Sequence, residues 1–396
     1  RRIGGDGRSS EAIPGGILAR MRRAGQRANG PAPAPQGNHE YAFLVGRLID
    51  AATLERAETE AVRSGVAIHE VLLATGWVGQ ADYAAQLARA IDVPFASWDA
   101  EIALSVPGGP GPSPELGYPA TVKGWSCRAL PATQATPETI RRRIGALRAG
   151  GFNVALVPGS CIDAATEAAL RQERIDRAVR DLLRGSAASS AGAPIWTWQI
   201  VAAACCAGLT IGGLAVLPDV TIAGLSAMMG LIFLCVVLLR VVALFEAVVR
   251  PTIRARKVRA GASRQADQEL PVYSVLVPLF REASVLPGLI QSLRTLDYPP
   301  AKLDVVLALE AVDTETQAAL LALELPGYFR TLIVPDHPPR TKPKALNYAL
   351  QFARGDFVVV YDAEDRPQPD QLRRALEVFR RAPAGLGCVQ AQLNIY

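Results

Sequence analysis

The stretch Phe357-Val-Val-Val-Tyr-Asp362-Ala-Glu364-Asp365 decides the fold of the C-terminal part of this chain. A β-branched, apolar run that ends abruptly in closely spaced carboxylates is typical of a buried strand that brings acidic groups to its C-terminal end. Open α/β sheets bind their ligands at that edge. The stretch therefore predicts a place for a metal ion and a nucleotide just after Tyr361.

The region from residue 270 to residue 396 alternates strand-like apolar runs with helical patterns, which is typical of an open, mostly parallel, Rossmann-like α/β sheet. The predicted strands are 272–278, 303–309, 331–334 and 357–361, and the predicted helices are 285–296, 314–325 and 344–353. Acidic residues follow three of these strands, namely Glu282, Glu310 with Asp313, and Asp362. Because the carboxyl ends of parallel strands meet at one edge, we expect these residues to line one nucleotide crevice.

A basic segment, Thr341-Lys342-Pro-Lys344-Ala-Leu-Asn347, stands about twenty residues before Asp362. Lys342 and Lys344 are candidates to contact a diphosphate, because ammonium groups form charge-assisted hydrogen bonds with phosphate oxygens. Asn347 is a candidate to hold the loop or a sugar. The alternative for this segment is a solvated, proline-broken loop before a helix.

Four motifs, in this order, resemble family 2 glycosyltransferases, in particular the processive membrane branch that includes cellulose, hyaluronan and cyclic β-glucan synthases. They are Val275-Leu-Val-Pro278 with Arg281-Glu282, the acidic turn from Glu310 to Asp313, Lys342-Pro-Lys344-Ala-Leu-Asn347, and Asp362-Ala-Glu364. The resemblance covers about residues 270–396. It implies an incomplete GT-A-type fold, a nucleotide-sugar donor that is expected to be UDP-linked, and Mg²⁺ or Mn²⁺ as cofactor.

The resemblance also implies roles for single residues. The donor-binding set is Pro278, Glu282, Glu310, Asp313, Lys342, Lys344, Asn347 and Asp362, and the metal-binding set is Asp362 and Glu364. A hard divalent cation that bridges carboxylate and phosphate oxygens neutralises the charge of the leaving group. On an extended backbone Asp362 and Glu364 point to the same side and both face one metal.

Two of these residues depart from the usual pattern of the family. Glu364 stands where the family has a second Asp, so its reach is longer and Asp365 is a candidate to share its task. Glu310 stands where an Asp of the family binds the base or the ribose. Glu282 has two candidate roles, contact with the ligand and capping of the helix that begins near Ser284.

The same resemblance implies an acceptor side that this chain does not contain. In the family an Asp of a Thr-Glu-Asp-like motif deprotonates the acceptor hydroxyl, and a Gln-x-x-Arg-Trp motif follows it. Both belong downstream of the point equivalent to Tyr396. We therefore expect residues 270–396 to be the donor half of a C-terminally truncated glycosyltransferase that alone does not polymerise sugar.

Two apolar segments precede this region and predict a transmembrane hairpin at 193–249. The spans 195–216 and 220–245, the second uncharged as far as Leu239, each have the roughly twenty residues that cross a bilayer as a helix. Basic residues flank the hairpin on its outer sides, before residue 185 and in a basic juxtamembrane linker at 250–269, and its short loop has none. The positive-inside rule then predicts a multi-pass protein of the bacterial inner membrane with both soluble parts in the cytoplasm.

The N-terminal part divides into three predicted segments. Residues 1–38 are rich in Gly, Pro, Ala and Arg and are expected to be disordered. Residues 39–184 carry two copies of a helical pattern and predict a small α+β domain, and 185–192 is a linker. This domain resembles the N-terminal domain of type II secretion and pilus ATPases, which implies a docking module or a cyclic di-GMP sensor. Ala67-Ile68-His69 stands where that family has Arg-Leu-Gly.

Composition argues against nucleic acid as a partner. A formal charge of +5 with 50% hydrophobic residues fits either nucleic-acid binding or a membrane protein with basic flanks. The basic residues concentrate beside apolar segments and do not interleave with aromatic ones, which favours the membrane. The six cysteines have no CxxC spacing, so we expect buried thiols rather than a disulfide scaffold.

These observations leave three hypotheses. The first is a membrane-anchored hexosyltransferase that moves sugar from a nucleotide-sugar donor to a growing polysaccharide or another acceptor. The alternative is a membrane-anchored regulatory or docking protein whose N-terminal domain senses cyclic di-GMP or a partner, with an inactive transferase remnant. A nucleotidyltransferase also places acids at strand ends, but it does not explain the hairpin or the segment from Lys342 to Asn347.

Overall fold

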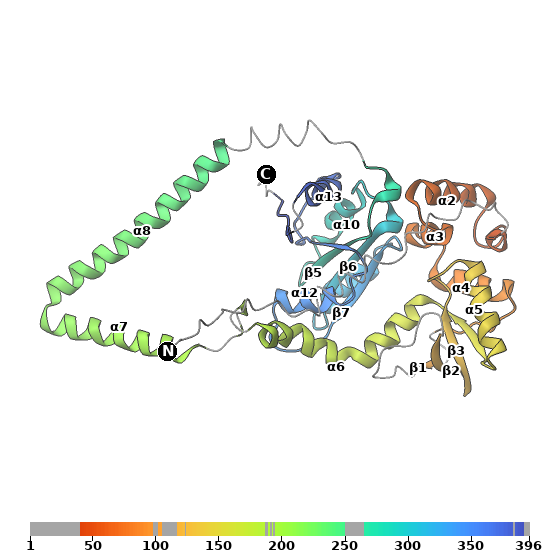
Figure 1. Ribbon diagram of the computed structural model, residues 1–396, viewed down its shortest axis with the longest axis horizontal. Helices are drawn as coiled ribbons and strands as arrows, with labels where there is room; N and C mark the ends of the chain where they lie inside the picture. Colours follow the sequence, from red (N-terminus) through yellow and green to blue (C-terminus); the bar gives the residue numbers. More distant parts are fainter. Residues whose placement is uncertain are drawn as a thin grey trace, which may run out of the picture. The chain divides into compact units, whose positions relative to one another are not determined.

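A computed structural model describes residues 40–97, 102–104, 117–122, 124–186, 189–190, 192, 195–249, 265–382 and 385–391 (Figure 1). The described residues form two units. One holds those up to Asp181 together with those from Gln265 onward, and the other holds those between Leu182 and Arg264. The predicted disordered segment 1–38 and most of the predicted basic linker lie outside the described residues.

A parallel sheet forms the centre of the C-terminal region. In the described residues its strands are β5 (Tyr273–Leu279), β6 (Leu303–Glu310), β7 (Phe329–Val334) and β8 (Phe357–Val360), in the order β7-β6-β5-β8. Every pairing is parallel, and every residue of the central strand β6 is buried. The predicted α/β class with an open parallel sheet is confirmed.

Helices cover both faces of this sheet (Figure 1). α10 (Leu286–Arg294), α11 (Thr314–Leu321) and α13 (Gln371–Arg381) bury apolar side chains in a core on one face. α12 (Lys342–Leu350) packs over β5, β6 and β7 on the other. α10 illustrates the cause, since its buried residues recur at helical spacing: Leu286, Leu289, Ile290 and Leu293.

β8 is only half buried, and here the structure corrects the sequence prediction. Phe357 and Val359 pack against the core, but Val358 and Val360 on the opposite face are 39% and 43% exposed. The reason is that among the described residues β8 pairs only with β5, and α12 lies over the other three strands. A β-branched run predicts a fully buried strand, although the same run also occurs where only one face of the strand is covered.

The N-terminal region holds helices that begin and end where the sequence indicates. α2 (Ala51–Ser64) starts at Asp50, whose Oδ1 accepts a hydrogen bond from the Thr53 amide at 2.8 Å. α2 and α3 (Ile68–Thr75) end at Gly65 and Gly76, which adopt φ of 66° and 77°. Glycine reaches this left-handed conformation without the clash that a Cβ would cause.

A small mixed sheet and two further helices follow. β1 (Ile102–Leu104), β2 (Tyr118–Val122) and β3 (Trp125–Pro131) pair antiparallel, and β4 (Val154–Val157) joins β3 in parallel. α4 (Gln80–Ala90) and α5 (Pro137–Ala149) pack on the same core as β4. The antiparallel strands were not predicted from the sequence.

α6 (Gly159–Gly185) is a helix of 27 residues. Its early part belongs with the N-terminal core, where Cys161 and Ile162 are buried. Further along, Ile175 and Ala178 join the apolar cluster that contains α12. One helix therefore belongs to the N-terminal domain and to the cover of the C-terminal sheet.

The second unit contains two long apolar helices, α7 (Thr197–Val216) and α8 (Pro218–Val249), that are joined at Leu217 (Figure 1). Their most apolar windows have mean hydropathies of 1.9 and 2.7, and both helices are long and apolar enough to cross a membrane by length and composition. The predicted hairpin loop at 217–219 is shorter than expected, because Pro218 and Asp219 already belong to the first turn of α8. Proline is well placed there, since its missing N–H has no partner in a first turn.

Candidate donor site

Lys342 and Asp362 meet at the C-terminal edge of the parallel sheet. Lys342 opens α12, Asp362 follows β8, and the Lys342 Nζ donates to Asp362 Oδ1 in an ion pair. Their side chains are 47% and 44% exposed. The pair is therefore open to solvent, and either group can change its partner when a charged ligand arrives.

The turn after Asp362 corrects the geometry expected for the metal site. β8 ends at Val360, and Ala363 and Glu364 lie in a turn rather than on an extended backbone. Asp365 closes this turn: its Oδ2 accepts from the Asp362 amide at 2.7 Å, and its own amide donates to the Asp362 carbonyl at 3.1 Å. The alternation argument that aligned Asp362 with Glu364 does not hold, and Asp365 uses one of its carboxylate oxygens to close the turn.

Asp362 and Glu364 still fit one way of holding a divalent cation. In the part of the chain that the structure describes, no group of three or more His, Cys, Asp or Glu side chains is arranged to bind a metal ion. Mg²⁺ and similar hard cations are commonly bound by one or two carboxylates together with substrate phosphates. The exposed carboxylates of Asp362 and Glu364 have the chemistry for that mode.

Lys344 forms a very different pair with Glu310. The Lys344 Nζ donates to Glu310 Oε2 at 3.0 Å and to the carbonyl oxygens of Pro335 and His337 at 3.3 Å each. The side chains of Lys344 and Glu310 are only 3% and 12% exposed. An ammonium group has three N–H donors, and here all of them are used. Lys344 thus ties α12 to the end of β6, and the predicted contacts of Lys344 and Glu310 with the donor do not fit this geometry.

Asp313 is also directed inward. It caps α11: its Oδ1 accepts from the Thr316 amide at 3.1 Å, and its Oδ2 accepts from the Arg281 amide at 2.5 Å. Burial alone would raise the pKa of Asp313, but the hydrogen bonds from Arg281 and Thr316 outweigh it and hold the pKa below its usual value. The carboxylate therefore shapes the loop after β5 and is not free to bind ribose as predicted.

The loop after β5 contains two residues that the sequence argument did not include in the site. Arg281 has φ of 60°, a left-handed conformation that costs a non-glycine residue energy and that often marks a functional site. Phe280 is 50% exposed, and the Arg281 guanidinium lies 5.2 Å from its ring centre. The available signal was an aromatic and a basic residue directly after a strand of a predicted crevice.

The remaining predicted residues divide between the site edge and the scaffold. Pro278 is half-buried on β5, beside Ala308 of β6. Glu282 is half-buried in the loop, and it is not the helix cap, because α10 has Val285 in that position. Asn347 does not point to the carboxylates: its Nδ2 donates to the Ala178 carbonyl of α6 at 3.0 Å.

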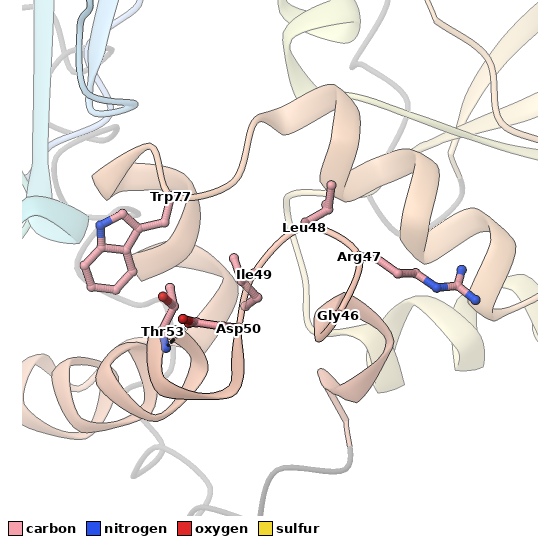
Figure 2. Close-up of a pocket in the computed structure, with 7 residues that line it drawn as sticks. All are labelled: Gly46, Arg47, Leu48, Ile49, Asp50, Thr53 and Trp77. Carbon is pink, nitrogen blue, oxygen red and sulfur yellow. Dashed lines mark hydrogen bonds between the residues drawn. The ribbon is translucent and has the colours of Figure 1, made fainter.

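A surface pocket of about 430 Å³ lies elsewhere, in the N-terminal domain (Figure 2). Its lining runs from Gly46 to Asp50 and includes Thr53 and Trp77. Figure 2 shows Arg47 extending away from Trp77, and its Nη1 donates to Gln86 at 3.2 Å. This pocket is built entirely from the N-terminal domain and takes no residue of the sheet edge.

The sheet edge with its exposed lysine–carboxylate pair lies in a region that matches a known protein family. Residues 274–394 match the model of the family described as "Glycosyl transferase family 2". This stretch is a glycosyltransferase family 2 domain. It includes all the strands of the parallel sheet except the first residue of β5, and all the candidate donor residues.

Relatives of this glycosyltransferase domain match only part of the chain. The probable glycosyltransferase YdaM of Bacillus subtilis strain 168 is 26% identical over 107 residues, which are 26% of each chain. The chain thus spans about a quarter of the length of this curated relative. Among solved structures, the mannosyltransferase PcManGT from Pyrobaculum calidifontis, in complex with GDP-Man and Mn²⁺, is 29% identical, covers 35% of this chain and 41% of its own, and has a TM-score of 0.28.

A second solved structure also matches only part of this chain. S. aureus TarS in complex with UDP-GlcNAc is 20% identical, covers 30% of this chain and 37% of its own, and has a TM-score of 0.24. The match to the family model is the basis on which residues 274–394 are assigned to glycosyltransferase family 2. Its processive branch, and the resemblance of residues 39–184 to secretion ATPases, stay predictions from the sequence.

Proposed function

We propose that the chain carries the donor-binding part of a membrane-anchored hexosyltransferase that uses a nucleotide sugar with Mg²⁺ or Mn²⁺. The observation that carries the proposal is the exposed pair of Lys342 and Asp362 at the C-terminal edge of a family 2 domain. A donor diphosphate offers the lysine a stronger partner than one carboxylate, and a cation bound with it does the same for the aspartate.

The residues around this pair have separate tasks in the proposal. Phe280 provides a partly exposed aromatic face on which a nucleotide base can stack. Asp313 fixes the loop that presents Phe280, because it accepts the Arg281 amide. Lys342 binds the diphosphate, and Asp362 with Glu364 holds the cation. The cation, when bound, stabilises the negative charge that develops on the leaving diphosphate.

The remaining expectations from the sequence belong to the same proposal. α7 and α8 anchor the chain as a hairpin in the bacterial inner membrane, and both soluble parts lie in the cytoplasm, where nucleotide sugars are found. The acceptor is a growing polysaccharide or another sugar acceptor. The N-terminal domain takes cyclic di-GMP or a protein partner. The regulatory alternative with an inactive transferase gains no support from the comparisons.

Nucleotide binding by the full chain in detergent or nanodiscs tests the proposal. We expect calorimetry with UDP and Mn²⁺ to show binding to the wild type and at least a tenfold weaker affinity for Asp362→Ala. Asp370→Ala is the matched control, because Asp370 is also an exposed acid (45%) in an ion pair, with Arg374 at 2.7 Å. GDP in place of UDP tests the expected base. Equal affinity of the wild type and Asp362→Ala, or no binding by a folded wild type, would contradict the proposal.

A further inference from the structure

α12 carries Lys342 at its first residue, and its later residues are attached to α6. Polar side chains of α12 and of its C-cap residue Gln351 make three hydrogen bonds to α6: Asn347 to the Ala178 carbonyl at 3.0 Å, Gln351 to the Arg174 carbonyl at 2.8 Å, and Tyr348 to Glu167 Oε1 at 3.0 Å. The donor-site helix is therefore hydrogen-bonded to a helix of the N-terminal domain.

The spacing of these bonds fixes how the two helices align. Asn347 and Gln351 are one turn apart on α12, and their acceptors Ala178 and Arg174 are one turn apart on α6, in the reverse order. The helices thus run antiparallel, with one turn matched to one turn. A slip of α12 along α6 would break both bonds together, so this arrangement defines the axial position of α12.

Packing and a held carboxylate reinforce the alignment. Ala345, Tyr348 and Ala349 of α12 lie in one apolar cluster with Ile175 and Ala178 of α6, and Tyr348 is 1% exposed. Glu167 is itself fixed by Arg171, with both N–O distances at 3.0 Å. Because the acceptor of the Tyr348 hydroxyl is held in this way, it restrains the orientation of the buried ring.

The N-terminal domain is anchored to the glycosyltransferase domain at a separate place, which keeps α6 from moving freely. The Tyr328 amide donates to the Ala74 carbonyl at the end of α3, at 3.1 Å. At Gly327 the two backbones approach so closely that a Cβ would lie 1.8 Å from the Leu73 carbonyl oxygen. Gln268 adds a bond of 2.8 Å to the Val62 carbonyl of α2.

We propose that α6 is a positioning element of the donor site, with Glu167 as its principal positioning residue. α6 sets the axial position and rotation of α12 through Tyr348, Asn347 and Gln351, and α12 in turn sets where the Lys342 ammonium stands relative to Asp362. The N-terminal domain is then a working part of the donor site. This inference rests on the proposed function, because it takes Lys342 to be a donor-binding group.

The test compares Glu167→Ala with Glu167→Gln in the full chain. The alanine variant removes the acceptor of the Tyr348 hydroxyl, whereas glutamine keeps an acceptor oxygen at the same reach. We expect Glu167→Ala to weaken UDP–Mn²⁺ binding about fivefold while the chain stays folded at the assay temperature, and Glu167→Gln to restore most of it. Gln351→Leu, which removes a different bond to α6, should act in the same direction.

Glu173→Ala is the matched control, because Glu173 is an exposed acid of α6 that pairs with Arg177 of the same helix and not with α12. Hydrogen exchange of the amides of 341–353 supplies a readout that needs no ligand, and it should be faster in Glu167→Ala only. Unchanged UDP affinity in Glu167→Ala and Gln351→Leu, with the wild type binding normally, would overturn the positioning role. A wild type that binds no UDP would overturn the proposed function, and exchange in 341–353 would then decide alone whether α6 restrains α12.

Discussion

Two lysines of α12, two positions apart, form two pairs of opposite character. Lys342 and Asp362 stand 47% and 44% exposed in solvent, whereas Lys344 and Glu310 are 3% and 12% exposed between α12 and β6. Both pairs join the start of α12 to the end of a strand. Chemical type and place in the chain are nearly the same, so burial is the difference that separates them.

The difference in burial determines which pair is available to a ligand. Charges that are buried together are held together, because separating them would leave each one desolvated without a partner. Lys344 also spends its other two donors on the carbonyls of Pro335 and His337. Exposed charges gain little from each other in water and exchange partners at small cost. The buried pair therefore builds the site, and the exposed pair is the one that a nucleotide can recruit.

Removal of the buried lysine should have the largest effect. We expect Lys344→Met to lower the free energy of unfolding by about 3–5 kcal/mol, because the charge of Glu310 stays buried without its partner. Urea unfolding of the full chain, followed by hydrogen exchange of the amides of β6 and α12, measures the loss, because the chain has no tryptophan after Trp198. The double variant Lys344→Met with Glu310→Gln removes both charges and should recover much of the stability. A loss below about 1 kcal/mol for Lys344→Met would mean that the pair is not buried in solution.

The contrast between the two pairs also shows which features can be predicted from the sequence alone. The four strands of 270–396 and the helices between them were predictable, because apolar runs, Gly and Pro positions and helical spacing are local signals, but α13 after β8 was not predicted. That Glu310, Lys344 and Asp362 gather at one edge was also predictable, since the carboxyl ends of parallel strands meet there. Which carboxylate is buried was not, because exposure depends on the side chains that neighbouring elements place around it.

Other features had no local signal at all. Asp362-Ala-Glu364 turns because Asp365 folds back to the Asp362 amide, and a strand pattern does not reveal its last residue. The antiparallel strands 118–122 and 125–131 are short and contain proline, which argues against a strand in a single sequence. The attachment of α6 to α12 joins residues about 170 positions apart, and no pattern within one segment predicts such a contact.

His69 is buried like Lys344 and Glu310, but its nearby hydrogen-bond partner is an uncharged tyrosine hydroxyl. His69 is 2% exposed, its Nδ1 lies 3.0 Å from the Tyr41 hydroxyl, and burial lowers its pKa from 6.5 to about 4. Lys344 has Glu310 as its partner, whereas burial keeps His69 neutral. As the pH falls, the unfolded chain is protonated first, so the stability that neutral His69 contributes is complete above about pH 6.5 and is lost between pH 6.5 and pH 4.

We expect this histidine to remove about 2 kcal/mol from the free energy of unfolding of the N-terminal domain between pH 7 and pH 5. Denaturant unfolding at the two pH values, followed by the fluorescence of Trp77 and Trp125, measures the change. His69→Gln keeps an acceptor for Tyr41 and does not titrate, so it should flatten the dependence. The same slope in this variant and in the wild type would assign the loss to other groups.

Removal of the exposed lysine should separate binding from stability. We expect Lys342→Ala to weaken UDP–Mn²⁺ binding about tenfold, because a charge-assisted hydrogen bond to the diphosphate is lost. Its free energy of unfolding should stay within about 0.5 kcal/mol of the wild type, as for most surface substitutions. Lys342→Arg keeps the charge and should retain most of the affinity. Unchanged UDP–Mn²⁺ binding by Lys342→Ala would mean that Lys342 and Asp362 do not bind the donor and, like Lys344 and Glu310, have only a structural role.

Salt should produce the smallest change in free energy, and it should distinguish the exposed ion pair from the buried one directly. In a double-mutant cycle for unfolding without ligand, Lys342 and Asp362 should couple by less than about 1 kcal/mol, and this energy should approach zero as NaCl rises from about 0.05 M to 0.5 M. The cycle for Lys344 and Glu310 should keep a larger coupling that salt barely changes, because buried charges are screened much less. A salt-resistant coupling between Lys342 and Asp362 would mean that the pair is closed against solvent. A nucleotide would then have to break it before binding, and the exposed pair would act as a latch on the donor site rather than as its open end.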